Sequence, residues 1–316
     1  MTYSYLSKKI KTAKTSYILS FLLLSQPGTS EENSITLAIL GVVQDAGYPQ
    51  AGCMTERCIR AWEDPSLQRG ATSLAVIDPN RKFTYLLEAT PNFPEQIYYL
   101  ESIAPHYKLS GIFLTHSHIG HYSGLMYLGH EAMSASEVPV YAMPRMQNFL
   151  LNNAPWSQLS DYKNIQINRL EADMETELGN VSITPFLVPH RDEFSETVGY
   201  RIKGPNRTAL FIPDINKWEL WERDIVTEIN NVDYAFIDAT FFSSGELPGR
   251  DMSKIPHPFV TESMEKFQNL ELSEKKKIFY IHMNHTNPLL DPDSSASNDV
   301  RSEGFNIAIE GMQFKL

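Results

Sequence analysis

The sequence predicts an α/β fold, because short apolar runs with the length and composition of strands alternate with segments of helical spacing. The strand-like runs of the first half are ITLAILGVV, TSLAVID, FTYLLEA and GIFLTH. The segments FPEQIYYLESIA and GLMYLGHEAMSAS carry apolar residues at the spacing expected of helices. The second half continues the strand pattern with VSITPFLVPH, TVGYRIK, ALFIPDI, YAFIDATFF, KIFYIHMN and FNIAIEGMQFKL.

Composition and layout indicate one ordinary folded domain. Hydrophobic residues make up 42% of the chain and charged residues 21%, close to the averages for soluble globular proteins. These values exclude a largely disordered chain and a polytopic membrane protein. No fixed period and no low-complexity linker divides the 316 residues. We therefore predict a single domain over residues 35–316.

The first residues have a different character from the rest. Lys8, Lys9, Lys11 and Lys14 form a basic start, and the apolar run SYILSFLLLS follows. This layout predicts a signal peptide and leader over residues 1–30. The apolar run is about half as long as the roughly 20 residues that cross a bilayer, so no transmembrane span is expected. We expect export to the periplasm or secretion, with a cytoplasmic location if the leader is not functional.

The charge balance bears on the kind of partner. The formal net charge is −11 at pH 7. Such a field repels the phosphate backbone of nucleic acids. We therefore expect a small-molecule substrate and no nucleic acid partner. The sequence does not predict the oligomeric state.

Three histidines lie within seven residues in the stretch THSHIGHYSGL. Alternate residues of a strand face the same way, so His116 and His118 should project to one side, and the next turn can bring His121 to the same point. A divalent metal with nitrogen ligands at about 2.0 to 2.1 Å requires this convergence. The spacing therefore predicts a metal site.

Further candidate ligands stand at the ends of later apolar runs. His190 closes FLVPH, Asp214 closes ALFIPD and His282 closes KIFYIH. Buried strands deliver such side chains to a common edge of the sheet, where clefts form. The sequence thus predicts one site assembled from distant segments.

The spacing His-x-His-x-x-His, followed by His190, Asp214 and His282, resembles the metallo-β-lactamase superfamily. Five motifs are similar to its pyrroloquinoline quinone (PQQ) biosynthesis protein B family: LGVVQDAGYPQAGC, YLLEATPNFPEQI, FIDATFF, IHMNHTNPLLDPDS and GFNIAIEGMQF. The resemblance covers nearly all of the chain after the leader. It implies an αββα four-layer sandwich, in which two sheets pack together with helices outside.

The resemblance also implies the distribution of ligands. His116, His118 and His190 correspond to a first metal site, and His121 and His282 to a second, with Asp214 bridging the two. Many hydrolytic members have an aspartate where this chain has Gly120. Because glycine offers no ligand, we expect the second site to have weaker occupancy, a different metal or an open coordination position.

Three functions are compatible with these residues. The first is a hydrolase of a small ester, amide or phosphodiester that uses a hydroxide bound to one or two zinc ions. The second is an iron-dependent oxygenase, which the PQQ biosynthesis protein B resemblance implies and for which His121, His282 and Asp214 form a suitable set. The third is a binding protein that retains metal without turnover. Manganese is a further candidate metal.

Two residues are predicted to support the catalytic chemistry. Asp238, in FIDATFF, is a candidate to accept a hydrogen bond from a metal-bound imidazole, with a turn-capping aspartate as the alternative. His257, in KIPHPFVTES, is a candidate general acid or substrate contact, with a packed loop histidine as the alternative.

Two cysteines form a C-x4-C pattern, Cys53 and Cys58, and His285 lies three residues after His282. The resemblance implies a structural zinc held by Cys53, Cys58 and His285, as in some phosphodiesterase members of the superfamily. A disulfide between the two cysteines is the alternative if the chain is exported. Two free thiols are the third option.

Overall fold

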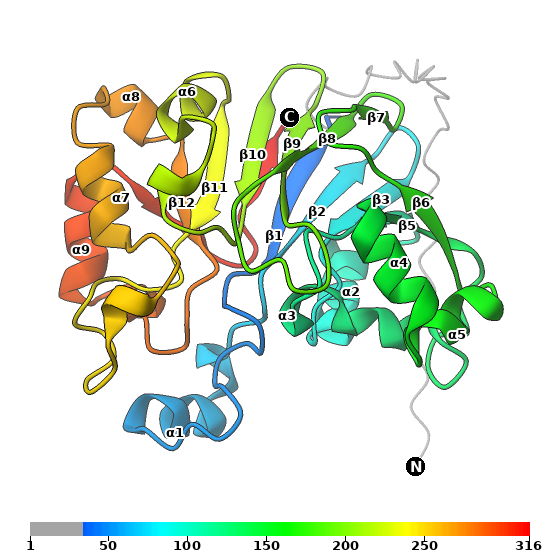
Figure 1. The fold of residues 1–316 in the computed structure, drawn as a ribbon, viewed down its shortest axis with the longest axis horizontal. Coiled ribbons are helices and arrows are strands. Elements are labelled where there is room, and N and C mark those ends of the chain that lie inside the picture. The colour runs from blue at the N-terminus through cyan, green and yellow to red at the C-terminus, as the bar shows by residue number, and fades with distance from the viewer. Residues whose placement is uncertain (1–33) are drawn as a thin grey trace, which may run out of the picture.

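Two seven-stranded sheets lie face to face, with helices on their outer sides, in the computed structural model (Figure 1). It describes residues 34–316, so the predicted leader lies outside the described residues. This arrangement confirms the αββα sandwich. Within the described part of the chain, no helix has the length and apolar character needed to cross a bilayer.

The first sheet has the order β14-β1-β2-β3-β4-β5-β6. Strands β14, β1, β2 and β3 pair antiparallel, whereas β3, β4, β5 and β6 run parallel. The bounds are β1 Thr36–Gly41, β2 Ser73–Asp78, β3 Phe83–Leu87, β4 Lys108–Phe113, β5 Val138–Ala142, β6 Ile165–Arg169 and β14 Gln313–Lys315.

The second sheet has the order β13-β12-β11-β10-β9-β8-β7. Strands β10 to β13 are parallel, and β7 to β10 are antiparallel. The bounds are β7 Thr176–Glu177, β8 Ser182–Leu187, β9 Val198–Lys203, β10 Thr208–Ile212, β11 Tyr234–Asp238, β12 Ile278–Ile281 and β13 Asn306–Ile307. The closing run FNIAIEGMQFKL, predicted as one strand, therefore supplies a short strand to each sheet, β13 and β14.

The helices divide between the two sheets (Figure 1). On the first sheet lie α2 Phe93–Ile103, α3 Ile119–Tyr122, α4 Pro144–Asn152 and α5 Trp156–Asp161, and on the second lie α6 Ile225–Asn230, α7 Val260–Lys266, α8 Leu272–Lys275 and α9 Ser295–Ser302. Helix α1, Glu56–Glu63, projects from the loop after β1. Short 3₁₀ turns are η1 Pro65–Leu67, η2 Ser123–Leu128, η3 Trp218–Leu220, η4 Met252–Lys254 and η5 Pro288–Leu290.

One predicted helix is wrong. In GLMYLGHEAMSAS only the start is helical, as the 3₁₀ turn η2, and the chain then turns through Ser134, which has a positive φ of 47°. Leu125 and Leu128 are buried three residues apart, which suits a 3₁₀ turn as well as an α-helix. The apolar spacing alone could not distinguish the two.

The core explains why the strands are so apolar. In β1, Leu37 and Ile39 face the core between the sheets, whereas Ala38 and Leu40 face the helices. Strand β2 alternates in the same way. Because both faces are covered, the strands carry continuous apolar runs, and polar side chains gather beyond the strand ends.

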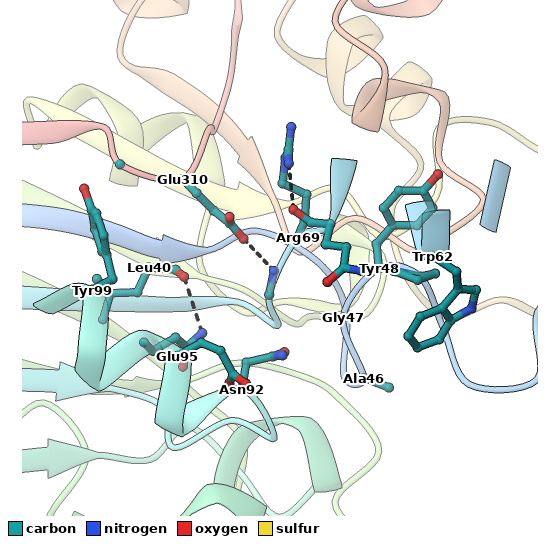
Figure 2. Close-up of a pocket in the computed structure, with 15 residues that line it drawn as sticks. Leu40, Ala46, Gly47, Tyr48, Trp62, Arg69, Asn92, Glu95, Tyr99 and Glu310 are labelled. Carbon is teal, nitrogen blue, oxygen red and sulfur yellow. Dashed lines mark hydrogen bonds between the residues drawn. The ribbon is translucent and has the colours of Figure 1, made fainter. Parts of the chain in front are cut away.

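A cavity of about 650 Å³ opens between α2 and the segments around Tyr48 and Glu310 (Figure 2). None of the predicted metal ligands lines it. Glu310 accepts a hydrogen bond there from the backbone N–H of Gly70. Burial raises the pKa of Glu310 to about 7, against the opposing effect of that hydrogen bond and of Arg69.

We expect Glu310→Gln to flatten the pH dependence of stability between pH 4.5 and 7. The folded chain holds the Glu310 proton more tightly than the unfolded chain, so stability present below the ordinary pKa of 4.5 is lost as pH rises towards 7. The loss is at most about 3 kcal/mol, at roughly 1.4 kcal/mol per pKa unit. Urea unfolding of the full chain in a chelator, at pH 5 and pH 7.5, measures it. Glu95→Gln, exposed on the same cavity, is the control; equal slopes for Glu310→Gln and wild type would contradict the prediction.

Candidate metal centre

The three clustered histidines lie beyond the end of a strand. Strand β4 ends at Phe113, so His116 and His118 occupy the following loop, and His121 lies in α3. The expectation that the first two sit in a strand is therefore wrong. They still converge, because His118 has an extended backbone just before the helix turns the chain. The Nε2 atom of His116 lies 2.8 Å from Nδ1 of His118.

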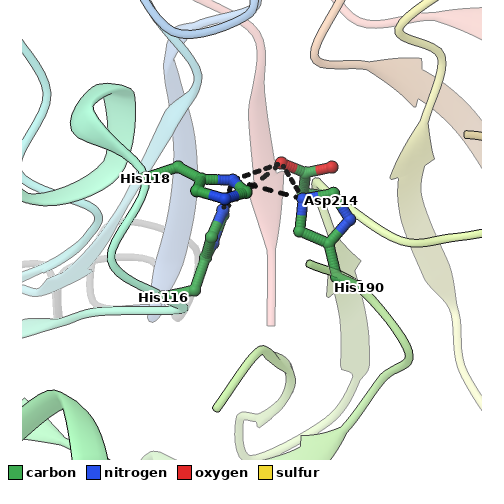
Figure 3. A group of neighbouring side chains, drawn as sticks. All are labelled: His116, His118, His190 and Asp214. Carbon is green, nitrogen blue, oxygen red and sulfur yellow. Dashed lines mark hydrogen bonds and ion pairs between the residues drawn. The ribbon is translucent and has the colours of Figure 1, made fainter. Parts of the chain in front are cut away.

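A first set of ligand atoms comes from His116, His118, His190 and Asp214, all within 4.8 Å of one another (Figure 3). His190 Nε2 lies 3.2 Å from His118 Nδ1. His190 follows β8, and Asp214 follows β10. Two ligands of one tetrahedral ion lie roughly 3.3 Å apart when each is about 2.0 Å from it. These spacings suit a metal ion held by nitrogen and oxygen.

A second set consists of Asp45, His121 and His282, whose ligand atoms also lie within 4.8 Å of one another. His282 directly follows β12, with a φ of +66°. The Oδ1 of Asp45 and the Nε2 atoms of both histidines are buried, and none has a hydrogen-bond partner among residues 34–316. Three unsatisfied atoms that face one another fit a metal ion. Asp45 was not among the predicted ligands.

Asp214 stands between the two sets. Its Oδ2 lies 3.4 Å from His116 Nε2, 3.2 Å from His190 Nε2 and 3.8 Å from His121 Nε2. Burial opposes ionisation of Asp214, but the imidazoles of His190 and His257 hold the pKa of this carboxyl well below its ordinary value. The chain thus places one buried carboxylate where both sets can share it.

Burial also sets the charge of the histidines. It lowers the pKa of His282 to about 4, against the effect of Asp214, and lowers the pKa of His116 well below its ordinary value. Both rings are therefore neutral at pH 7 and keep the lone pair that a metal needs. Burial would lower the pKa of His121 too, but Glu88, Asp45 and Asp214 together outweigh it and raise that pKa to about 9. A metal at His121 would have to displace a proton.

Neighbouring side chains hold the second nitrogen of each clustered imidazole. Thr115 Oγ1 lies 2.8 Å from His116 Nδ1, and Glu193 Oε2 lies 3.3 Å from His118 Nε2. Such contacts fix the ring that presents its other nitrogen to a metal.

Glu88 lies beside the second nitrogen of His121 as an ion-pair partner. Its side chain is fully buried, and its Oε1 lies 3.4 Å from His121 Nδ1. Glu88 directly follows β3 and has a φ of +82°. Sequence reasoning missed it, although an acid at the end of the buried run FTYLL was an available signal.

Asp238 and His257 lie beside the centre. His257 Nδ1 is 2.8 Å from Asp238 Oδ2 and 3.2 Å from Asp214 Oδ1. Asp238 Oδ1 accepts hydrogen bonds from the N–H and the hydroxyl of Thr240, whose Oγ1 lies 3.1 Å from His282 Nδ1. Asp238 therefore reaches predicted metal ligands only indirectly, His282 through Thr240 and Asp214 through His257. Its direct imidazole partner is His257.

At the predicted structural zinc site the structure has the disulfide alternative. Cys53 and Cys58 are joined by a disulfide, with a Cα–Cα distance of 5.9 Å. His285 lies close to both sulfur atoms. A disulfide has no thiolate to offer, so Cys53, Cys58 and His285 hold no zinc in this oxidised form.

The sequence is similar to those of known proteins. A family model described as beta-lactamase superfamily domain matches residues 84–283. The chain is 23% identical over 309 residues to coenzyme PQQ synthesis protein B of Xanthomonas campestris pv. campestris (strain B100), covering 89% of this chain and 99% of that protein. It is 24% identical over 308 residues to the protein of that name from Methylorubrum populi, with the same coverage.

Solved structures show the same fold. The crystal structure of Zn(2+)-bound PqqB from Methylobacterium extorquens matches with a TM-score of 0.74 and 22% identity, over 89% of this chain and 100% of that one. A diphosphatase from the PhnP family matches with a TM-score of 0.62 and 21% identity, over 89% of this chain and 97% of that one.

Proposed function

This chain belongs to the β-lactamase superfamily, and from that premise we propose that it is a metal-dependent hydrolase of a small ester, amide or phosphodiester. One observation carries the proposal. A single carboxylate oxygen, Asp214 Oδ2, lies within 3.9 Å of a nitrogen of four histidines, namely His116, His118, His121 and His190. One carboxylate would thus join two adjacent metal positions.

The residues fit zinc, since imidazole and carboxylate are ligands that zinc accepts. His116, His118 and His190 would hold one ion, and His121 and His282 a second. A bound zinc ion lowers the pKa of its water to about 7 and so supplies a nucleophile at neutral pH. Glu88, Thr115, Thr240 and Glu193 orient the imidazoles.

His257 is suited to give a proton to the leaving group. Its Nδ1 is occupied by Asp238 and Asp214, so Nε2 is the nitrogen that can meet a substrate. Burial would lower the pKa of His257, but Asp238 and Asp214 outweigh it and raise that pKa to about 9. The ring is then protonated at neutral pH, which is the form a general acid requires.

The oxygenase alternative is less well supported by the ligands present. An iron site for oxygen activation typically combines two histidines and one carboxylate with open positions. Around His121 and His282 the chain offers two carboxylates, Asp45 and Asp214. The second carboxylate reduces the number of open positions and favours hydrolysis.

The test uses the full chain loaded separately with zinc and with iron(II). Substrates are p-nitrophenyl acetate, nitrocefin and bis(p-nitrophenyl) phosphate, with and without dioxygen. We expect zinc-dependent turnover of at least one substrate without dioxygen. Dioxygen consumption with iron alone would favour the oxygenase, and bound metal without either activity would favour a binding protein.

We also propose that residues 1–30 direct export, which their basic and apolar pattern supports. The disulfide between Cys53 and Cys58 is of the kind that persists in oxidising compartments. The expected observation is a chain shortened by about the predicted 30-residue leader in the exported fraction, with no titratable thiol after denaturation until a reductant is added. Full-length chain confined to the cytoplasm would contradict export, and two thiols without reductant would contradict the disulfide.

A further inference from the structure

We propose that Asp45 is a metal ligand, so that the second ion is held by His121, His282, Asp45 and the shared Asp214. The inference rests on the metal centre of the proposed function and deepens it. It replaces the expectation that Gly120 leaves the second site without a ligand.

The spacing of Asp45 and His121 suits two ligands of one metal ion. Asp45 Oδ1 lies 3.7 Å from His121 Nε2. This separation is too long for a hydrogen bond, which ends near 3.2 Å. It is close to the roughly 3.3 to 3.6 Å between two ligands of one ion at bond lengths of about 2.0 to 2.2 Å.

The ligand atoms of the second set are buried without hydrogen-bond partners in the described part of the chain. The Asp45 side chain is 40% exposed as a whole, yet its Oδ1 is buried and has no hydrogen-bond partner within residues 34–316. His121 Nε2 and His282 Nε2 are also buried and also lack a hydrogen-bond partner within those residues. Leaving three buried polar atoms without a hydrogen bond is costly, so their convergence favours an additional binding partner. A divalent cation satisfies all three.

The imidazoles of His121 and His282 are both oriented with one nitrogen towards Asp45. Glu88 lies against Nδ1 of His121, and Thr240 lies against Nδ1 of His282. In both rings the second nitrogen, Nε2, is therefore the one that faces Asp45. Metal-binding histidines are commonly held in this way.

Backbone contacts hold the loop of Asp45 close to His282. Gln44 N donates to Met283 O at 2.9 Å, and Val43 forms a bridge with Met283, so the loop is fastened beside His282. Asp45 has a φ of +43°. Residues held in such conformations often serve a functional site.

The close contact of the Asp45 loop explains why residue 120 is a glycine. A Cβ at position 120 would lie 2.3 Å from Cα of Asp45 and 2.6 Å from its Oδ1. No side chain fits there while the Asp45 loop keeps its place. The absence of a side chain at Gly120 thus makes room for a carboxylate that comes from a distant loop.

The test counts zinc ions bound by the full chain, with zinc as the only added ligand. Metal content after gel filtration and titration calorimetry are compared for wild type, Asp45→Asn, Gly120→Asp and the double variant Asp45→Gly/Gly120→Asp. Asp161→Asn, on the exposed end of α5, is the matched control. Thermal unfolding in a chelator shows whether each variant folds.

We expect two zinc ions in wild type and in Asp161→Asn. Asp45→Asn should reduce the affinity for the second zinc ion at least about 10- to 100-fold. Mutation of a side chain that only supports a metal ligand already reduces metal affinity by this factor. Gly120→Asp alone should also lose the second ion, because its Cβ collides with the Asp45 backbone. The double variant should remain without the second ion, because Asp45→Gly leaves in place the Cα that lies 2.3 Å from the new Cβ.

The inference is overturned if Asp45→Asn binds two zinc ions with wild-type affinity, or if wild type binds one ion only. Because the readout is metal content, the proposed function can fail separately. Loss of one ion in Asp45→Asn, in a chain that hydrolyses nothing, would support the inference and contradict the hydrolase. Hydrolysis by wild type, with two ions retained in Asp45→Asn, would support the hydrolase and contradict the inference.

Discussion

Asp214→Asn is expected to weaken the binding of both metal ions and to reduce zinc-dependent hydrolysis by at least about 10³-fold. Asp214 Oδ2 lies within 3.9 Å of histidines from both sets of ligands. An asparagine has nearly the same shape but carries no charge, and its amide oxygen is a weaker ligand. Mutation of a side chain that only supports a metal ligand already reduces metal affinity by about 10- to 100-fold. Loss of a shared ligand should therefore reduce the affinity at each position by at least this factor.

Thermal unfolding gives a readout that does not depend on finding the substrate. A ligand at 1,000 times its Kd stabilises a folded chain by about 4 kcal/mol. For a domain of this size, at an unfolding entropy of about 2.1 cal/mol/K per residue, that amounts to a rise in Tm of roughly 7 °C. We expect zinc to produce such a rise in wild type and in Asp161→Asn, and only a small one in Asp214→Asn. Equal zinc-dependent rises in wild type and Asp214→Asn would show that Asp214 is not a shared ligand.

Much of this fold follows from the sequence because the strands are buried on both faces. Runs such as TSLAVID and ALFIPDI are therefore continuous and easy to recognise, and they correspond to β2 and β10. The same feature exposed the candidate ligands. A histidine or aspartate that ends an apolar run, as His282 and Asp214 do, stands out against its surroundings.

Asp45 was not predicted because nothing local distinguishes it. Asp45 lies in the turn QDAG, where an aspartate is common for conformational reasons alone. Its meeting with His121 depends on the bridge between Val43 and Met283, which are 240 residues apart. Gly120 was interpreted as a missing ligand for the same reason: the residue that occupies its space comes from another segment.

His118→Ala should have a different effect from Asp214→Asn, because His118 belongs to one set of ligands only. Its Nδ1 lies 2.8 Å from His116 Nε2 and 3.2 Å from His190 Nε2, at the centre of the three-histidine set. The ligand atoms of Asp45, His121 and His282 form a separate group. We therefore expect one zinc ion to remain, with hydrolysis reduced by at least about 10³-fold since the nucleophile depends on the lost ion.

The side chain of His118 is 17% exposed, so water can enter the space left by alanine and the fold should survive. His106→Ala, whose ring is 94% exposed and remote from the predicted ligands, is the matched control. Metal analysis, activity and thermal unfolding in a chelator separate the outcomes. Loss of one ion with unchanged chelator stability is the expected result, and it would show that the two sets bind independently. Loss of both ions would mean that the second set depends on the first, whereas two ions and normal activity would mean that the three-histidine set is not the reactive site.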